Sequence, residues 1–266
     1  MKEIVSRSGR SAREVALQAV GEAGEVLMRH FQGRLKVTQK GTGRRNIVTD
    51  VDILSEKNII GVLRKEFPDF GVLSEEAGNL AGSSALTWII DPLDGTNNYV
   101  FGIPFFCITI SLVRGRDVLL GVVYEPVRGE FFVAEKGGGA YLNGKPVSVS
   151  GKASLQDSIL GYDIGYNPQR GREMLDVVCH LWPQVYGLRA MGSAALSIAY
   201  VGCGRLDLYF HRFLYPWDIA AGLAFVSEAG GRVTDWKGRT AGPRNRQIIA
   251  SNEALRTEFL GRVGQK

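Results

Sequence analysis

The chain has 266 residues, of which 45% are hydrophobic and 22% charged, and its formal net charge is +5. This composition is typical of a globular protein, and the length suffices for one large domain or two closely packed halves. No apolar run reaches the roughly 18 residues of a membrane span, and no apolar segment follows the basic start as in a signal peptide. Cys107, Cys179 and Cys203 form neither a CxxC pair nor a metal-ligand cluster, so we expect free thiols and a cytoplasmic protein.

The first half of the chain is expected to combine two amphipathic helices with a run of strands. Apolar residues recur at helical spacing over 11–31, where Ser11 suits the N-terminal cap, and over 51–67, which Pro68 ends. Apolar runs bounded by turn residues predict strands over 35–39, 71–73, 87–90, 106–113, 118–124 and 131–135.

The second half alternates helices with strands. Residues 148–158 are small and polar, so we expect a boundary there between an N-terminal half (1–150) and a C-terminal half (151–266) of one compact unit. Strands are predicted over 159–162, 187–190, 207–210, 232–234 and 248–250, and helices over 170–181, 194–201, from Pro216 onward, and over 253–263. This pattern favours an α/β (α+β) protein with layered packing.

The segment from Trp88 to Asn98 carries the strongest chemical signal. An apolar strand leads directly into Asp91, and Pro92 favours an extended backbone at that residue. Asp94 follows three residues later, Gly95 permits a sharp turn, and Thr96 can cap a short helix. Oxygen ligands beside backbone N–H groups suit Mg²⁺ bound to a phosphate. The same residues also suit a turn in which Asp94 only hydrogen-bonds the loop.

Three further segments place acidic residues at the ends of elements. Asp218 lies in the first turn of the helix that begins at Pro216, where the helix dipole stabilises negative charge. Asp52 opens the second helix, and Glu75 and Glu76 follow a strand. Taken singly, each of these is also explained by a helix-dipole carboxylate or a solvated acidic pair.

In this order and spacing, the four segments resemble the inositol monophosphatase family of Mg²⁺-dependent, lithium-sensitive phosphatases. Residues 91–96 (DPLDGT) match the family's first signature, and residues 217–222 (WDIAAG) with 228–231 (EAGG) match its second. The likeness extends from about residue 12 to residue 255. It implies a layered α-β-α-β-α sandwich and hydrolysis of phosphate monoesters with two to three Mg²⁺ ions.

The resemblance also implies roles for single residues in metal binding and catalysis. Glu75, Asp91 and the Leu93 carbonyl would hold the first Mg²⁺; Asp91, Asp94 and Asp218 the second; Asp52 and Glu75 a weaker third. Thr96, with Glu75 or Asp52, would help the attacking water lose its proton. The N–H groups of Gly95 and Thr96 would bind phosphate oxygens, and no covalent phosphoenzyme is needed.

The position expected to select the substrate departs from the family pattern. Seven residues before the second-signature aspartate, the family commonly has an acid that binds inositol hydroxyls, whereas this chain has His211 followed by Arg212. The pair could meet a second anionic group, as on fructose 1,6-bisphosphate, or lie exposed on the surface. Ser193, Ala194 and Asp218 are further expected contacts with an inositol or sugar phosphate.

Other readings of the chain remain open. A fructose-bisphosphatase, a histidinol-phosphatase or a nucleotide 3′-phosphatase would share the same metal site. A non-catalytic role in RNA or protein binding could use the basic stretch Lys36–Arg45, although this stretch lacks the interleaved aromatic residues of a nucleic-acid surface. Of these readings we favour the phosphatase. We expect a homodimer that binds a small phosphate ester, with no membrane contact and without nucleic acid as its partner.

Overall fold

The structure is a computed structural model that describes residues 4–41 and 44–264. Its α-helices are α1 (Ala12–His30), α2 (Asp50–Glu66), α3 (Thr96–Val100), α4 (Pro168–Leu181), α5 (Ala194–Gly202), α6 (Pro216–Glu228) and α7 (Glu253–Val263). Its strands are β1 (Val37–Gln39), β2 (Ile47–Thr49), β3 (Gly71–Ser74), β4 (Gly78–Leu80), β5 (Leu86–Asp94), β6 (Cys107–Arg114), β7 (Asp117–Glu125), β8 (Glu130–Glu135), β9 (Gly139–Leu142), β10 (Lys145–Pro146), β11 (Ile159–Tyr162), β12 (Gly187–Ala190), β13 (Leu208–His211), β14 (Arg232–Thr234) and β15 (Ile248–Ser251). Within the described ranges, every helix is too short or too polar to cross a membrane.

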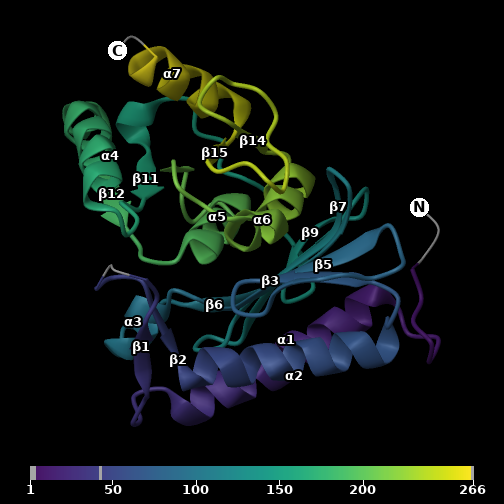
Figure 1. Cartoon of the computed structure of the whole chain (residues 1–266). Helices are drawn as coiled ribbons and strands as arrows, with labels where there is room; N and C mark the ends of the chain where they lie inside the picture. Colours follow the sequence, from purple (N-terminus) through teal and green to yellow (C-terminus); the bar gives the residue numbers. More distant parts are fainter. Residues whose placement is uncertain (1–3, 42–43, 265–266) are drawn as a thin grey trace.

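The helices and sheets stack in five layers (Figure 1). An eight-stranded sheet, in the order β10-β9-β8-β7-β6-β5-β3-β4, has α1 and α2 on one face and α5 and α6 on the other. A five-stranded sheet, in the order β12-β11-β13-β15-β14, packs one face on α5 and α6 and the other on α4 and α7. The α-β-α-β-α sandwich implied by the resemblance is therefore confirmed.

Both sheets are buried on both faces, which explains their nearly continuous apolar strands. In β13, Leu208 and Phe210 pack toward α4 and α7, whereas Tyr209 between them packs toward α5 and α6. In β7, Val122 faces α1 and α2, and Val123 faces α5 and α6. Each central strand thus connects two hydrophobic cores.

Strand β5 brings the first motif to the carboxyl edge of the large sheet. Its pairing with β6 shifts register between Asp91 and Asp94, so the strand bulges at Pro92, which has no N–H to donate. Gly95 then adopts a left-handed backbone with φ 92°. A Cβ at this position would lie 3.1–3.2 Å from atoms of Phe105, Phe106 and Ser193, so only glycine fits the turn.

Some elements were not predicted from the sequence. Strand β2 pairs with β1 in an antiparallel hairpin, and β1 begins at Val37 rather than at residue 35. Every residue of β1 is exposed, so it lacks the apolar alternation that reveals a half-buried strand. The short strands β4, β9 and β10 were also missed. Among the described strands, those of the large sheet precede residue 150 and those of the small sheet follow it, and the division into halves there stays a prediction.

Candidate active site

A cavity of about 400 Å³ lies at the carboxyl end of β5 and receives side chains from both halves of the chain. Its lining comprises Lys40, Asn46, Ile47, Glu75, Asp91, Leu93–Asn97, Asp163–Tyr166, Gly192, Ala194, His211, Phe213–Tyr215, Trp217 and Asp218. Most residues singled out from the sequence meet here. Asp52 and Ser193 are not part of the lining and lie behind it.

Three aspartates from two elements converge in this cavity. Asp91 and Asp94 come from β5 and Asp218 from the first turn of α6, and each offers one oxygen within 4.8 Å of the others. One oxygen of each carboxylate accepts a backbone N–H bond, from Leu93 at 3.0 Å, from Ala195 at 2.9 Å and from Tyr215 at 2.7 Å, respectively. These bonds fix the three carboxylates in one arrangement.

Asp91 and Asp94 are buried, and Asp218 is half-buried beside them. Burial raises the pKa of Asp91 and of Asp218 well above the ordinary value, and neighbouring carboxylates raise both further. Burial also raises the pKa of Asp94 to about 6, against the hydrogen bonds that stabilise its ionised form. A divalent cation among these oxygens would remove the repulsion, and carboxylate oxygens are the ligands that Mg²⁺ prefers. The donor set therefore fits Mg²⁺.

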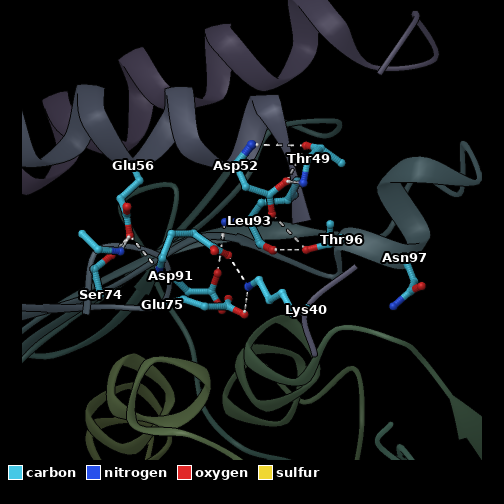
Figure 2. A network of polar contacts seen from close by, with 12 residues as sticks. Lys40, Thr49, Asp52, Glu56, Ser74, Glu75, Asp91, Leu93, Thr96 and Asn97 are labelled. Carbon is cyan, nitrogen blue, oxygen red and sulfur yellow. Dashed lines mark hydrogen bonds and ion pairs between the residues drawn. The ribbon is translucent and has the colours of Figure 1, made fainter. Parts of the chain in front are cut away.

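Glu75 lies beside the aspartates and is paired with a lysine. The Nζ atom of Lys40 lies 2.8 Å from Oε1 of Glu75 and also contacts Glu76 (Figure 2). Burial lowers the pKa of Lys40, but the two carboxylates outweigh it and raise the pKa above its ordinary value. Lys40 belongs to the basic stretch Lys36–Arg45, whose residues 42 and 43 lie outside the described residues. This stretch thus turns one of its lysines into the cavity.

The turn that carries Glu75 is held by a buried glutamate that the sequence analysis missed. Glu56 in α2 accepts a hydrogen bond from the Ser74 hydroxyl and one from each N–H of Glu76 and Ala77, both at 3.0 Å (Figure 2). Glu56 follows Asp52 by four residues, on the same face as the buried Ile59. Its acidic side chain on a buried helical face was the available signal.

Asp52 lies behind the cavity in a network with two threonines. Its Oδ2 accepts the N–H of Thr49 at 2.9 Å and the Thr49 hydroxyl, and its Oδ1 accepts the Thr96 hydroxyl at 3.1 Å. Burial raises the pKa of Asp52 to about 6, although these hydrogen bonds act in the other direction. Asp52 and Thr49 together form the capping box of α2.

The expectation that Thr96 caps the short helix is wrong. Gly95 is the N-cap residue of α3 and Thr96 is its first helical residue. The Thr96 hydroxyl instead points back toward β5, 3.0 Å from the Leu93 carbonyl oxygen and 3.1 Å from Asp52 Oδ1 (Figure 2). Because the helix starts in the left-handed turn of Gly95, its first hydroxyl faces the carboxylates rather than the helix end.

Ser193 and Ala194 occupy different places. Ala194 lines the cavity, whereas Ser193 is 1% exposed and donates its hydroxyl hydrogen to Oδ2 of Asp94. This hydroxyl is therefore engaged with Asp94 and lies outside the cavity wall that a substrate would meet. Cys107 is also buried beside Asp94, with its Sγ 3.7 Å from Oδ2, and all three cysteines are free.

His211 is buried, and Arg212 points elsewhere. His211 is 3% exposed and lines the cavity, so it is not a surface residue. Its Nδ1 accepts the N–H of Phe213 at 2.9 Å, and burial lowers its pKa to about 4. The neutral ring therefore carries its hydrogen on Nε2 and acts as a donor there. Arg212 instead stacks over Trp236 at 4.0 Å and does not line the cavity, so the two residues do not act as an anion-binding pair.

The sequence analysis also missed Asp163, a further carboxylate of the cavity wall. Asp163 follows β11 and accepts the N–H of Gly192 at 2.6 Å and the Tyr209 hydroxyl at 2.9 Å. Burial raises the pKa of Asp163 to about 7. Gly192 begins the turn whose Ser193 hydroxyl hydrogen-bonds Asp94, so Asp163 supports the three-aspartate cluster from the side of the small sheet. In the sequence it is a lone acid after a strand, without a motif around it.

The sequence model of the inositol monophosphatase family matches residues 10–265. The chain belongs to this family. Its members are metal-dependent phosphomonoesterases, and the cluster of Asp91, Asp94 and Asp218 has a geometry that could hold a metal ion.

Relatives in this family carry different names. The chain is 40% identical over 252 residues to "Nus factor SuhB" of Xylella fastidiosa, covering 91% of this chain and 90% of that protein. It is 38% identical to "Fructose-1,6-bisphosphatase/inositol-1-monophosphatase" of Thermotoga maritima, covering 95% of both. Among solved structures, the extragenic suppressor protein suhB of Bartonella henselae superposes with a TM-score of 0.90 at 36% identity, over 95% of this chain and 98% of that one.

Proposed function

We propose that the protein hydrolyses inositol 1-phosphate or related sugar phosphates with Mg²⁺, by direct attack of water on the phosphate. The observation that carries this proposal is the convergence of Asp91, Asp94 and Asp218 at one end of a cavity large enough for a phosphorylated sugar. Membership of a family of metal-dependent phosphomonoesterases supports the same reaction class.

The metal ligands in this proposal are the residues assigned from the resemblance. Glu75, Asp91 and the Leu93 carbonyl would hold one Mg²⁺, Asp91, Asp94 and Asp218 a second, and Asp52 with Glu75 a third. Bound Mg²⁺ neutralises the phosphate dianion, makes water more acidic and stabilises the leaving alkoxide. Lys40, which pairs with Glu75 in the cavity wall, would be a further cation beside the phosphate.

The chain's own groups prepare the attacking water and the phosphate. The Thr96 hydroxyl donates to either Asp52 Oδ1 or the Leu93 carbonyl oxygen, which leaves its oxygen free to accept a hydrogen bond from water. A proton can then pass from that water through Thr96 to Asp52, with Glu75 as the other candidate base. The N–H groups of Gly95 and Thr96 at the start of α3 would bind phosphate oxygens.

The leaving group would occupy the part of the cavity around His211. Here the chain offers the Nε2–H donor of a neutral imidazole where many relatives are expected to offer a carboxylate acceptor. This exchange removes repulsion against a second phosphate and supports a broad sugar-phosphate phosphatase. The Thermotoga maritima relative is named for two activities, on fructose 1,6-bisphosphate and on inositol 1-phosphate, and this supports a broad substrate range.

A substrate panel tests this proposal. Phosphate release should be measured with and without Mg²⁺ on inositol 1-phosphate, fructose 1,6-bisphosphate, histidinol phosphate and phosphoadenosine phosphate. We expect Mg²⁺-dependent turnover with the first two substrates. Turnover confined to histidinol phosphate or to the nucleotide would assign the chain to one of those phosphatases instead.

The relatives named "Nus factor SuhB" favour a second candidate, a non-catalytic role in RNA or protein binding. The basic stretch Lys36–Arg45 would provide the surface for it. Salt-dependent RNA binding that survives Asp94→Asn would support this candidate, since the variant alters only the carboxylate cluster. A homodimer and a cytoplasmic location also remain predictions.

A further inference from the structure

A second cavity, of about 430 Å³, lies against the face of the large sheet formed by β3, β5 and β6, and its lining does not include the carboxylates. Its floor is the sheet face formed by paired residues: Leu73 of β3 lies opposite Ile89 of β5, and Thr87 of β5 lies opposite Val113 of β6. Residues two apart along a strand point to the same side, so these four side chains share one surface. The floor is mostly apolar, and its size is that of a small-molecule site.

Two arginines from distant parts of the chain form the rim. Arg116 comes from the turn between β6 and β7, and Arg244 from the loop between β14 and β15. No acidic residue lies among the described residues of the lining, and Asp117 next to Arg116 pairs with Lys136 at 2.6 Å instead. The rim therefore carries positive charge over an apolar floor.

The roof of this cavity is formed by residues 242–245, a turn that hydrogen bonds between its two ends hold together. Gly242 and Asn245 are joined by two hydrogen bonds, from Gly242 N to Asn245 Oδ1 at 2.9 Å and from Asn245 N to the Gly242 carbonyl oxygen at 3.0 Å. Arg116 lies against this turn, since a Cβ at Gly242 would be 3.2 Å from a guanidinium nitrogen. The loop thus lies directly beside one of the two arginines.

The same loop reaches the first cavity. The carbonyl oxygen of Arg246 accepts the N–H of Leu214 at 2.8 Å, and the Arg246 guanidinium lies 4.5 Å above the ring of Tyr215. Tyr215 stacks on Trp217 with ring centroids 5.0 Å apart, and Trp217 precedes Asp218. A shift of the roof would therefore move the first turn of α6, which carries the predicted metal ligand Asp218.

The floor leads to the carboxylates as well. Leu73 lies two residues before Glu75, and Ile89 lies two residues before Asp91. Both side chains belong to one small apolar cluster that also includes Trp217. The second cavity thus includes residues of the segments that carry Glu75 and Asp91, and its floor packs in one cluster with Trp217, which precedes Asp218.

We propose that this second cavity is an effector site for a small organic anion, a phosphate ester, sulfonate or carboxylate with an apolar body, which regulates the first cavity. Arg116 and Arg244 bind the anionic group, and Leu73, Ile89 and Val113 contact the apolar body. Arginine suits this task because its planar guanidinium binds such groups through two hydrogen bonds. The regulatory half rests on the proposed phosphatase function, whereas the binding half does not.

The probe that tests the binding half is 8-anilinonaphthalene-1-sulfonate, an apolar anion that a phosphatase cannot hydrolyse. Its dissociation constant is measured by fluorescence titration of the wild type, the double variant Arg116→Ala/Arg244→Ala and the matched control Arg114→Ala. Arg114, the last residue of β6, is also an exposed arginine but does not line the cavity. We expect saturable binding of the probe to the wild type. The double variant should raise the dissociation constant about 10-fold or more, because hydrogen bonds to a charged group are lost, and the control should leave it unchanged.

The second readout is the KM for p-nitrophenyl phosphate with and without the probe. We expect the probe to change this KM by about 5-fold in the wild type and in Arg114→Ala, within the usual range of allosteric coupling, and to leave it unchanged in the double variant. Basal activity of the double variant should equal that of the wild type. Probe binding that ignores both rim arginines would overturn the site, and arginine-dependent binding without a kinetic effect would overturn the regulation. A chain that binds the probe but hydrolyses nothing would contradict the proposed phosphatase instead.

Discussion

The hydroxyl of Ser193 offers a direct way to test how Asp94 is positioned. Asp94 Oδ2 accepts two strong hydrogen bonds, from the Ser193 hydroxyl and from Ala195 N at 2.9 Å, so Ser193→Ala removes one of them. A hydrogen bond to a charged group contributes about 1.5–3 kcal/mol, which corresponds to roughly 10- to 100-fold in a binding constant. Because the partner is a proposed Mg²⁺ ligand, we expect the loss mainly in metal affinity.

The assay is a Mg²⁺ titration of phosphate release. Ser193→Ala should raise the half-saturating Mg²⁺ concentration about 10- to 100-fold, while kcat at saturating Mg²⁺ recovers to within a few-fold, and Ser193→Thr should restore most of the affinity. Ser197→Ala is the matched control, since its equally buried hydroxyl donates to the Ser193 carbonyl oxygen at 2.6 Å and does not touch Asp94. An unchanged Mg²⁺ dependence in Ser193→Ala, or an equal shift in Ser197→Ala, would refute the reasoning.

Three further predictions concern the cavity. His211→Glu introduces a hydrogen-bond acceptor for vicinal hydroxyls. It should raise the ratio of kcat/KM for inositol 1-phosphate to kcat/KM for fructose 1,6-bisphosphate about 10-fold. An unchanged ratio would show that His211 does not contact the leaving group. Burial lowers the pKa of His211 from 6.5 to about 4, so the unfolded chain binds a proton at His211 more readily than the folded chain does. As the pH falls from 7 to 4, the free energy of unfolding of the wild type should therefore decrease by up to about 3 kcal/mol more than that of His211→Gln, with no difference in slope above pH 7. Urea titrations that give parallel pH profiles for the two proteins would contradict this. Li⁺ should inhibit phosphate release, as the family resemblance implies, and a flat titration into the molar range would show that this chain is insensitive.

The carboxylates that could be predicted from the sequence are those whose positions depend on residues close to them in the chain. Asp94 follows Asp91 by three positions, with Pro92 between them and Gly95 directly after, and Asp218 follows Pro216 by two positions. The local backbone therefore largely determines where each carboxylate lies. The helices and apolar strands of the sequence pattern favoured layered packing, whereas the α-β-α-β-α order was implied by the family resemblance.

The remaining contacts depend on residues that are far apart in sequence. Lys40 reaches Glu75 across 35 residues, and Asp163 reaches Gly192 across 29. Neither pairing has a local signature, because each depends on how the hairpin and the two sheets pack together. The orientation of Thr96 was mispredicted because a threonine after Gly95 suits a helix cap, whereas the left-handed turn directs its hydroxyl to Asp52.

The most direct test of the account is phosphate release by Asp94→Asn at saturating Mg²⁺. This substitution keeps the shape of the side chain and removes one charged oxygen from the three-aspartate cluster. Loss of a ligand to a catalytic metal should lower kcat by about 100-fold or more on inositol 1-phosphate or fructose 1,6-bisphosphate, with an unchanged melting temperature as the check on folding. Turnover close to that of the wild type would contradict the assignment of this cluster as the metal site.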